Sequence, residues 1–144
     1  MPCLRGLPHE CETPMAKPKP LKVTEETRFL VFARAGYRCE RCFKQLHGVF
    51  GVSVHHRRPR MMGGSSKFEL HLPSNLIVLC GSGNTGCHGW VESNRNKARE
   101  HGYLIHRVES APEIPFRDNA GIWYLLDNEG LKRQFDTNGA NNDI

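Results

Sequence analysis

Residues 75–88, NLIVLCGSGNTGCH, place an apolar run, a glycine-rich linker and two cysteines next to one another. The run NLIVLC has the length and apolar character of a buried strand, with a turn of helix as the alternative. Gly, Ser, Asn and Thr fill the linker between Cys80 and Cys87, and such residues let the chain double back. A helix is expected from about His88 to Gly102, so the two thiols would lie between a strand and a helix.

A second pair of cysteines precedes this stretch, because Cys39 and Cys42 have the C-x2-C spacing of a zinc knuckle. Zinc prefers four thiolate or imidazole ligands in a tetrahedron, and a C-x2-C turn presents two sulfurs along one edge of it. Cys80 and Cys87, spaced C-x6-C, would supply the other edge. We therefore predict a structural Zn²⁺ ion bound by these cysteines, with four buried thiols as the alternative. Such an ion would add folding free energy to a chain with a modest core.

The composition is that of a small, mildly basic protein. The chain has 144 residues, which suits one domain, and its 20 Lys and Arg exceed its 15 Asp and Glu, for a formal net charge of +5. A basic excess fits a polyanionic partner such as nucleic acid or a membrane surface. No apolar run reaches the ~20 residues of a membrane span, and the first residues lack a secretory signal. We therefore expect a cytoplasmic protein whose six cysteines stay reduced, which favours metal ligands over disulfides.

Proline content and apolar patterning divide the chain into four segments. We expect a flexible arm, a main domain, a strand and hairpin extension packed on that domain, and a disordered tail, at residues 1–22, 23–102, 103–136 and 137–144. The arm holds Cys3 and Cys11, which we expect to be free thiols, with added metal ligands as the alternative.

A helix is expected to begin after Thr24, which can cap it, and to stop at Gly36. Glu25 and Glu26 suit the positive end of its dipole. The expected buried stripe of this helix consists of Phe29, Leu30, Phe32 and Ala33.

Three strand signals complete the local reading. Alternating apolar residues at 52 and 54 predict a short strand that leads into two histidines. Residues 103–108 read as a further strand, and residues 121–135 read as a hairpin that bends at 127–130.

The two histidines, His55 and His56, stand side by side, and Pro59 and a glycine pair at 63–64 interrupt the strand soon afterwards. Neighbouring side chains on a strand point to opposite faces. At a strand end, one imidazole could hold a metal ion while the other stays neutral and accepts a proton, because free imidazole has a pKa near ~6.5. The residues alone leave open which histidine takes which role.

Taken together, C-x2-C, HH-x2-P-x4-G, SNLIVLC and a CH pair that opens a helix resemble the HNH endonucleases of the ββα-metal type, and most closely the small HNH proteins of bacteriophages. The resemblance covers residues 25–135 and is strongest from Cys39 to His88. It implies an α+β fold: a small zinc-stapled ββα-metal domain at 23–102 with an N-terminal helix and a C-terminal β-hairpin.

By position, the resemblance makes His55 the first metal ligand, His56 the general base, and Asn75 the residue whose amide braces the loop that carries the base. It makes His88 the second metal-binding histidine, at the start of a helix, and matches the four cysteines to structural zinc knuckles. Some members have another histidine one helical turn later, where this chain has Glu92. A carboxylate there could bind Mg²⁺ or Mn²⁺, and a solvated helix residue is the alternative. Four other histidines fall outside the motif and receive no role: His47, His71, His101 and His106.

The activity that the resemblance implies is metal-dependent hydrolysis of DNA phosphodiester bonds, with 5′-phosphate and 3′-hydroxyl products. The catalytic divalent cation would be Mg²⁺, Mn²⁺, Ni²⁺ or Zn²⁺. DNA is then the expected partner, and phage DNA packaging or processing, in the cytoplasm of a host cell, is the expected setting. The pattern fits a monomer and a dimer equally.

Basic side chains next to the histidines would contact phosphates, since Arg binds them through a planar fork. The expected DNA-binding residues are Arg57, Arg58 and Arg60. Two other functions stay open: a non-catalytic, zinc-stabilised nucleic-acid-binding module, and a protein-interaction domain with Trp90, Trp123 and Tyr124 as its apolar face.

Overall fold

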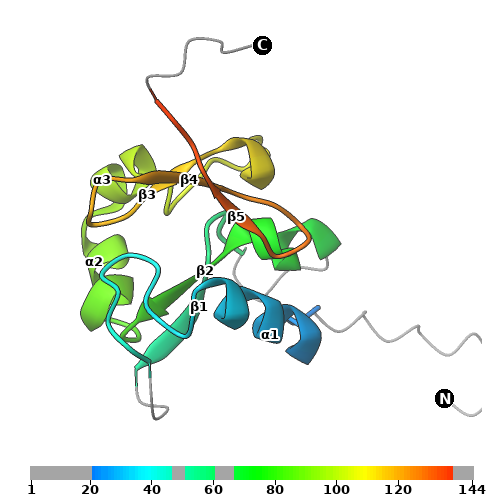
Figure 1. The fold of residues 1–144 in the computed structure, drawn as a ribbon, viewed down its shortest axis with the longest axis horizontal. Helices are drawn as coiled ribbons and strands as arrows, with labels where there is room; N and C mark the ends of the chain where they lie inside the picture. The colour runs from blue at the N-terminus through cyan, green and yellow to red at the C-terminus, as the bar shows by residue number, and fades with distance from the viewer. Residues whose placement is uncertain (1–20, 47–50, 61–66, 138–144) are drawn as a thin grey trace, which may run out of the picture.

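The computed structural model describes residues 21–46, 51–60 and 67–137. This part of the chain is a small mixed α+β structure with three α-helices and two small antiparallel sheets (Figure 1). The helices are α1 (Glu25–Arg34), α2 (Gly86–Ser93) and α3 (Arg95–Glu100). One sheet holds β1 (Val52–His56) and β2 (Leu76–Cys80), and the other holds β3 (Phe116–Arg117), β4 (Trp123–Leu126) and β5 (Lys132–Gln134). The 3-10 turns in the connections are η1 (Phe68–His71), η2 (Pro73–Asn75) and η3 (Ala111–Glu113).

Some expectations fall on other parts of the chain. Most of the expected arm at 1–22, with Cys3 and Cys11, and most of the expected tail at 137–144 lie outside the described residues, as does the glycine pair at 63–64. Across the described ranges, no helix has both the length and the apolar character that a membrane crossing requires.

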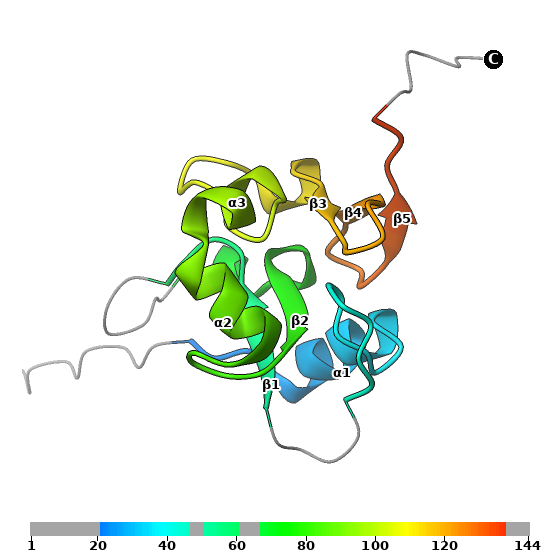
Figure 2. The same cartoon turned by 90° about the vertical axis from the view of Figure 1, so that its left-hand side faces the viewer.

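The sheet of β1 and β2 lies between two helices, with α1 on one face and α2 on the other (Figures 1 and 2). Leu76 and Val78 pack on the α1 side with Val31, whereas Ile77 and Leu79 pack on the α2 side. Because both faces are covered, β2 is buried at every position. The apolar run NLIVLC is therefore a strand, and the alternative of a helical turn is wrong.

Helix α1 begins as expected, because the Thr24 Oγ1 accepts a hydrogen bond from the Thr27 backbone N–H at 3.1 Å. Its expected buried stripe is wrong at Phe29, which is 64% exposed, at Leu30, which is 38% exposed, and at the exposed Ala33, whereas Phe32 packs against the core as expected. The inner face instead carries Val31 and, one turn later, the Arg34 side chain, which is 1% exposed. A hydropathy pattern counts an arginine as outward-facing, so it predicts the wrong face here.

The second half of the domain departs from expectation in two places. The expected helix from His88 to Gly102 is two helices, because Asn94 breaks it with φ −125° and ψ 53°. The expected strand at 103–108 is irregular, although Tyr103 and Ile105 are buried. Its backbone N–H groups do not pair with a strand: the Tyr103 N–H bonds to the Ala98 carbonyl and the Ile105 N–H to the Arg57 carbonyl.

The expected C-terminal hairpin is present. Strands β4 and β5 pair across residues 127–130, and β3 pairs with the other side of β4. Two of the three aromatic residues considered as an interaction face pack inward, because Trp90 and Tyr124 contact the core cluster around Tyr103 and Phe116; the third, Trp123, is half-buried.

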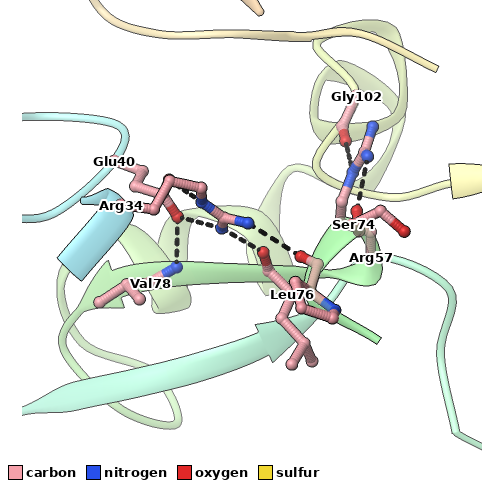
Figure 3. A network of polar contacts seen from close by, with 8 residues as sticks. Arg34, Glu40, Arg57, Ser74, Leu76, Val78 and Gly102 are labelled. Atoms are coloured by element: carbon pink, nitrogen blue, oxygen red, sulfur yellow. Dashed lines mark hydrogen bonds and ion pairs between the residues drawn. The ribbon is translucent and has the colours of Figure 1, made fainter. Parts of the chain in front are cut away.

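A buried ion pair ties α1 to the sheet (Figure 3). Arg34 and Glu40 meet at 2.9 Å with side chains 1% and 0% exposed. Glu40 also accepts the Val78 N–H, and Arg34 donates to the Pro73 and Leu76 carbonyls. Each charge is therefore hydrogen-bonded as well as paired, which offsets its desolvation.

Arg57 forms a second buried centre and corrects one sequence prediction. It is fully buried, and its guanidinium donates to four backbone carbonyls, those of Ser74, Gly102, Ala111 and Ile114 (Figure 3 shows the first two). Burial lowers its pKa to about 10, so it stays charged at neutral pH. The expectation that Arg57 contacts DNA phosphate is wrong, because its donors are used inside the fold.

We predict that Arg57→Ala lowers the free energy of unfolding by ~3 kcal/mol or more, because it leaves several buried carbonyls without a donor. Chemical denaturation followed by circular dichroism measures the change. Arg60→Ala, at an exposed position, is the control and should change stability little. Equal stability of both variants would contradict the structural role of Arg57.

Candidate metal centres

Four thiols converge where the knuckle after α1, the end of β2 and the first turn of α2 meet. The sulfurs of Cys39, Cys42, Cys80 and Cys87 all lie within 4.8 Å of one another. The Cys42 and Cys80 sulfurs are 3.7 Å apart, and ligands ~2.3 Å from a tetrahedral zinc ion would be separated by ~3.8 Å. The cluster therefore fits a metal ion such as zinc in both donor type and spacing.

The linker between Cys80 and Cys87 closes as its composition predicts. Gly81 and Gly86 have φ of +83° and +59°, which L side chains rarely adopt. A Cβ at Gly81 would collide with the Thr85 carbonyl, and one at Gly86 would lie 2.6 Å from the Cys80 carbonyl oxygen. Both glycines are therefore required for the close turn that brings the second sulfur back to the first.

The thiols share protons unequally. A hydrogen bond from the Cys87 thiol lowers the pKa of Cys39 to about 4, whereas that bond and burial raise the pKa of Cys87. Arg41 also donates to the Cys87 sulfur at 3.5 Å and lies 3.7 Å over the Trp90 ring. Four thiol ligands suit a soft dication, whose binding would release the protons that the cysteines still hold.

We predict that the purified protein contains tightly bound zinc and that Cys39→Ser removes it and lowers the thermal midpoint by ~10 °C or more. Mass spectrometry under native conditions and calorimetry measure the two effects. Cys11→Ser is the matched control and should keep the metal, since four sulfurs already complete a tetrahedron. Zinc retained at the wild-type level in Cys39→Ser would count against the cluster.

A second group of candidate ligands consists of His55, His88 and Glu92, whose donor atoms lie within 4.8 Å of one another. His55 is opposite Ile77 in the sheet and therefore faces α2, where His88 lies in the first turn. Glu92 follows His88 by one helical turn on the same face. The carboxylate is 41% exposed and pairs with Arg95 at 3.1 Å, which fits a metal ligand and a solvated helix residue alike.

Each imidazole of this group has one nitrogen engaged and one free. The Nε2 of His55 is 2.9 Å from the Tyr103 carbonyl, and the Nδ1 of His88 is 3.0 Å from the Gly83 carbonyl. A carbonyl only accepts, so these nitrogens carry the protons and the opposite nitrogens keep their lone pairs. Burial lowers the pKa of His55 to about 4, which keeps it neutral. Backbone carbonyls that orient histidines in this way are typical of metal sites.

His56 lies on the other face of the sheet, opposite Leu76. Its Nε2 is 3.3 Å from the Nδ1 of His71, and the two rings meet edge to face with centroids 5.3 Å apart. Among the described residues, no hydrogen bond engages its Nδ1. Burial, and then the positive charge of Arg60, lower its pKa to about 4. His56 is thus a neutral ring with one nitrogen free.

Asn75 connects the segments around this ring. Its Oδ1 accepts the Arg58 backbone N–H at 2.8 Å, and its Nδ2 donates to the Leu70 carbonyl at 2.9 Å. Its own backbone carbonyl accepts the Arg57 N–H at 2.8 Å. The residue therefore fixes the chain just after β1 to the end of η1.

The basic residues after the histidines differ in what they can reach. Arg58 bonds to Glu69 at 3.2 Å and to the Arg107 and Glu109 carbonyls, which leaves its side chain 17% exposed. Arg60 is exposed. Of the three arginines expected to bind DNA, Arg60 is thus the most accessible.

The fold and site define a small, cysteine-rich α+β protein with two candidate metal centres. No family model matches the chain, and neither the curated proteins nor the solved structures contain a match. Its function must therefore be inferred from the geometry of its sites.

We predict that the protein binds a second divalent ion with lower affinity than the first, and that His88→Ala lowers the affinity for this second ion by ~10-fold or more. Calorimetric titration of zinc-loaded protein with Mn²⁺ or Ni²⁺ measures the affinity. His106→Ala is the control, because that residue is exposed and outside both ligand groups. If His88→Ala bound the second ion with unchanged affinity, that ion would have to bind elsewhere.

Proposed function

We propose that the protein is a metal-dependent DNA endonuclease of the HNH type, which leaves 5′-phosphate and 3′-hydroxyl ends. One observation carries the proposal: the end of β1 gives His55 to a set of candidate metal ligands, and the next residue, His56, is a neutral ring whose Nδ1 makes no hydrogen bond to any described residue. A structural protein has no need for such a pair. The order β1, β2, α2, with the four-cysteine cluster beside it, supports the same conclusion.

In the proposed reaction, the Nδ1 of His56 takes a proton from water, and the hydroxide attacks phosphorus as the bond to the 3′ oxygen breaks. The 3′ oxygen gains a proton from solvent, and His56 later releases its own proton to solvent. A divalent cation bound by His55, His88 and Glu92 would neutralise charge that develops on the phosphate oxygens. The pKa of His56, lowered to about 4, keeps the ring unprotonated, and an anionic phosphate raises that pKa towards neutrality.

The other residues hold this arrangement in place. Asn75 fixes the chain after β1 through the oxygen and the nitrogen of its side-chain amide, so the backbone that carries the His56 ring is held in place. Arg60 is the proposed phosphate contact, with Arg58 as a second contact if it leaves Glu69. DNA is the proposed partner, and phage DNA packaging or processing the proposed setting.

We predict that the protein nicks or cuts supercoiled plasmid with Mg²⁺, Mn²⁺ or Ni²⁺, and that His56→Ala lowers the rate by ~100-fold or more, because the proton acceptor is lost. Gel assays over a panel of metals measure cutting, and EDTA should stop it. His106→Ala is the matched control and should cut at the wild-type rate.

Two results would contradict this proposal. Full activity in His56→Ala would remove His56 from the reaction. Wild-type protein that binds plasmid but cuts it with none of the metals would instead favour the non-catalytic nucleic-acid-binding module.

A further inference from the structure

We propose that His71 is a positioning residue: its Nδ1 accepts a hydrogen bond from the Nε2–H of His56 and so leaves the Nδ1 of His56 as the nitrogen that takes the proton. The contact between the two nitrogens is observed, whereas the direction of the hydrogen bond and its catalytic consequence rest on the proposed function. The sequence gives no signal for this residue, which lies in a long irregular connection between the two strands of the sheet.

The geometry places the two rings in a fixed relation. The nitrogens are 3.3 Å apart, and the planes are perpendicular at 90°, so the edge of one ring faces the other. His71 ends η1 and is 6% exposed. Its neighbour Leu70 is held by Asn75 through the 2.9 Å bond to its carbonyl. Asn75 therefore fixes both the strand end that carries His56 and the turn that carries His71.

The direction of the hydrogen bond decides the chemistry. If His71 donates, neutral His56 must carry its own proton on Nδ1, and no lone pair is left for water. If His56 donates, its Nδ1 is free, and the bond becomes stronger and charge-assisted once that nitrogen is protonated. Only the second direction is compatible with a base at His56.

The second nitrogen of His71 supports a role beyond packing. Within the described residues, its Nε2 is buried and has no hydrogen-bond partner. An unsatisfied buried polar atom costs stability, and an apolar ring of similar size would avoid that cost. A histidine whose one buried nitrogen lacks a partner while the other lies against a candidate base fits a functional role better than a structural one.

The test uses zinc-loaded, full-length protein and three substitutions. Asn places an amide near the position of the histidine Nδ1, Gln places it near Nε2, and Phe keeps only the ring. We expect His71→Phe and His71→Gln to lower kcat by ~10–100-fold with KM for plasmid nearly unchanged, and His71→Asn to recover most of the rate. We also expect His71→Phe to be at least as stable as wild type, whereas a packing role predicts parallel losses of stability and rate.

Long-range ¹H–¹⁵N NMR of the imidazoles provides a readout that needs no cutting. We expect neutral His56 to be protonated on Nε2 in the wild type and in His71→Asn, and to lose this preference in His71→Phe. A proton on Nδ1 of His56, or full kcat in His71→Phe, overturns the inference. If the protein cuts no DNA but His56 shows the His71-dependent tautomer, the proposed function fails while the hydrogen bond stands.

Discussion

The antiparallel register of β1 against β2 decides where each candidate ligand lies. His55 is opposite Ile77 and faces α2, and His56 is opposite Leu76 and faces away from it. A slip of one residue would exchange the two rings, because strand side chains alternate between faces. The register is held at both ends: the Arg57 N–H bonds to the Asn75 carbonyl at one end, and Cys80 enters the thiol cluster at the other.

The small core explains why polar groups hold so much of this fold together. A chain of this size buries a limited apolar area, so other interactions must fix its segments. Arg34 with Glu40 ties α1 to β2, and Arg57 gathers carbonyls from three separate segments. The four thiols join the remaining elements, and a bound metal ion would make that junction depend on metal supply.

The features that sequence could predict are those with a local signal. The Thr24 cap, the buried run at 76–80, the hairpin bend and the spacing of four cysteines each depend on a few neighbouring residues. The burial of Arg57 depends on carbonyls that lie 17 to 57 residues further along the chain. The contact of His71 with His56 depends on a turn inside an irregular loop. For Arg57, residue type alone leads to a wrong prediction, since an arginine beside histidines suggests phosphate binding. Only the tertiary structure shows that its donors are already used.

The burial of Arg57 changes how the positive charge around the histidines should be understood. The run HHRRPR places three arginines after the two rings, yet only Arg60 is exposed and unpaired with an acidic residue in the described structure. That one charge also lowers the pKa of His56, because it disfavours a protonated ring. Burial is the larger cause of that shift, so the ring would stay unprotonated chiefly because it is buried, and Arg60 would add to the effect while attracting a phosphate. An anion beside Arg60 would remove only this smaller contribution, so substrate binding would raise the pKa of His56 in part, and the buried setting of the ring would keep setting most of its basicity.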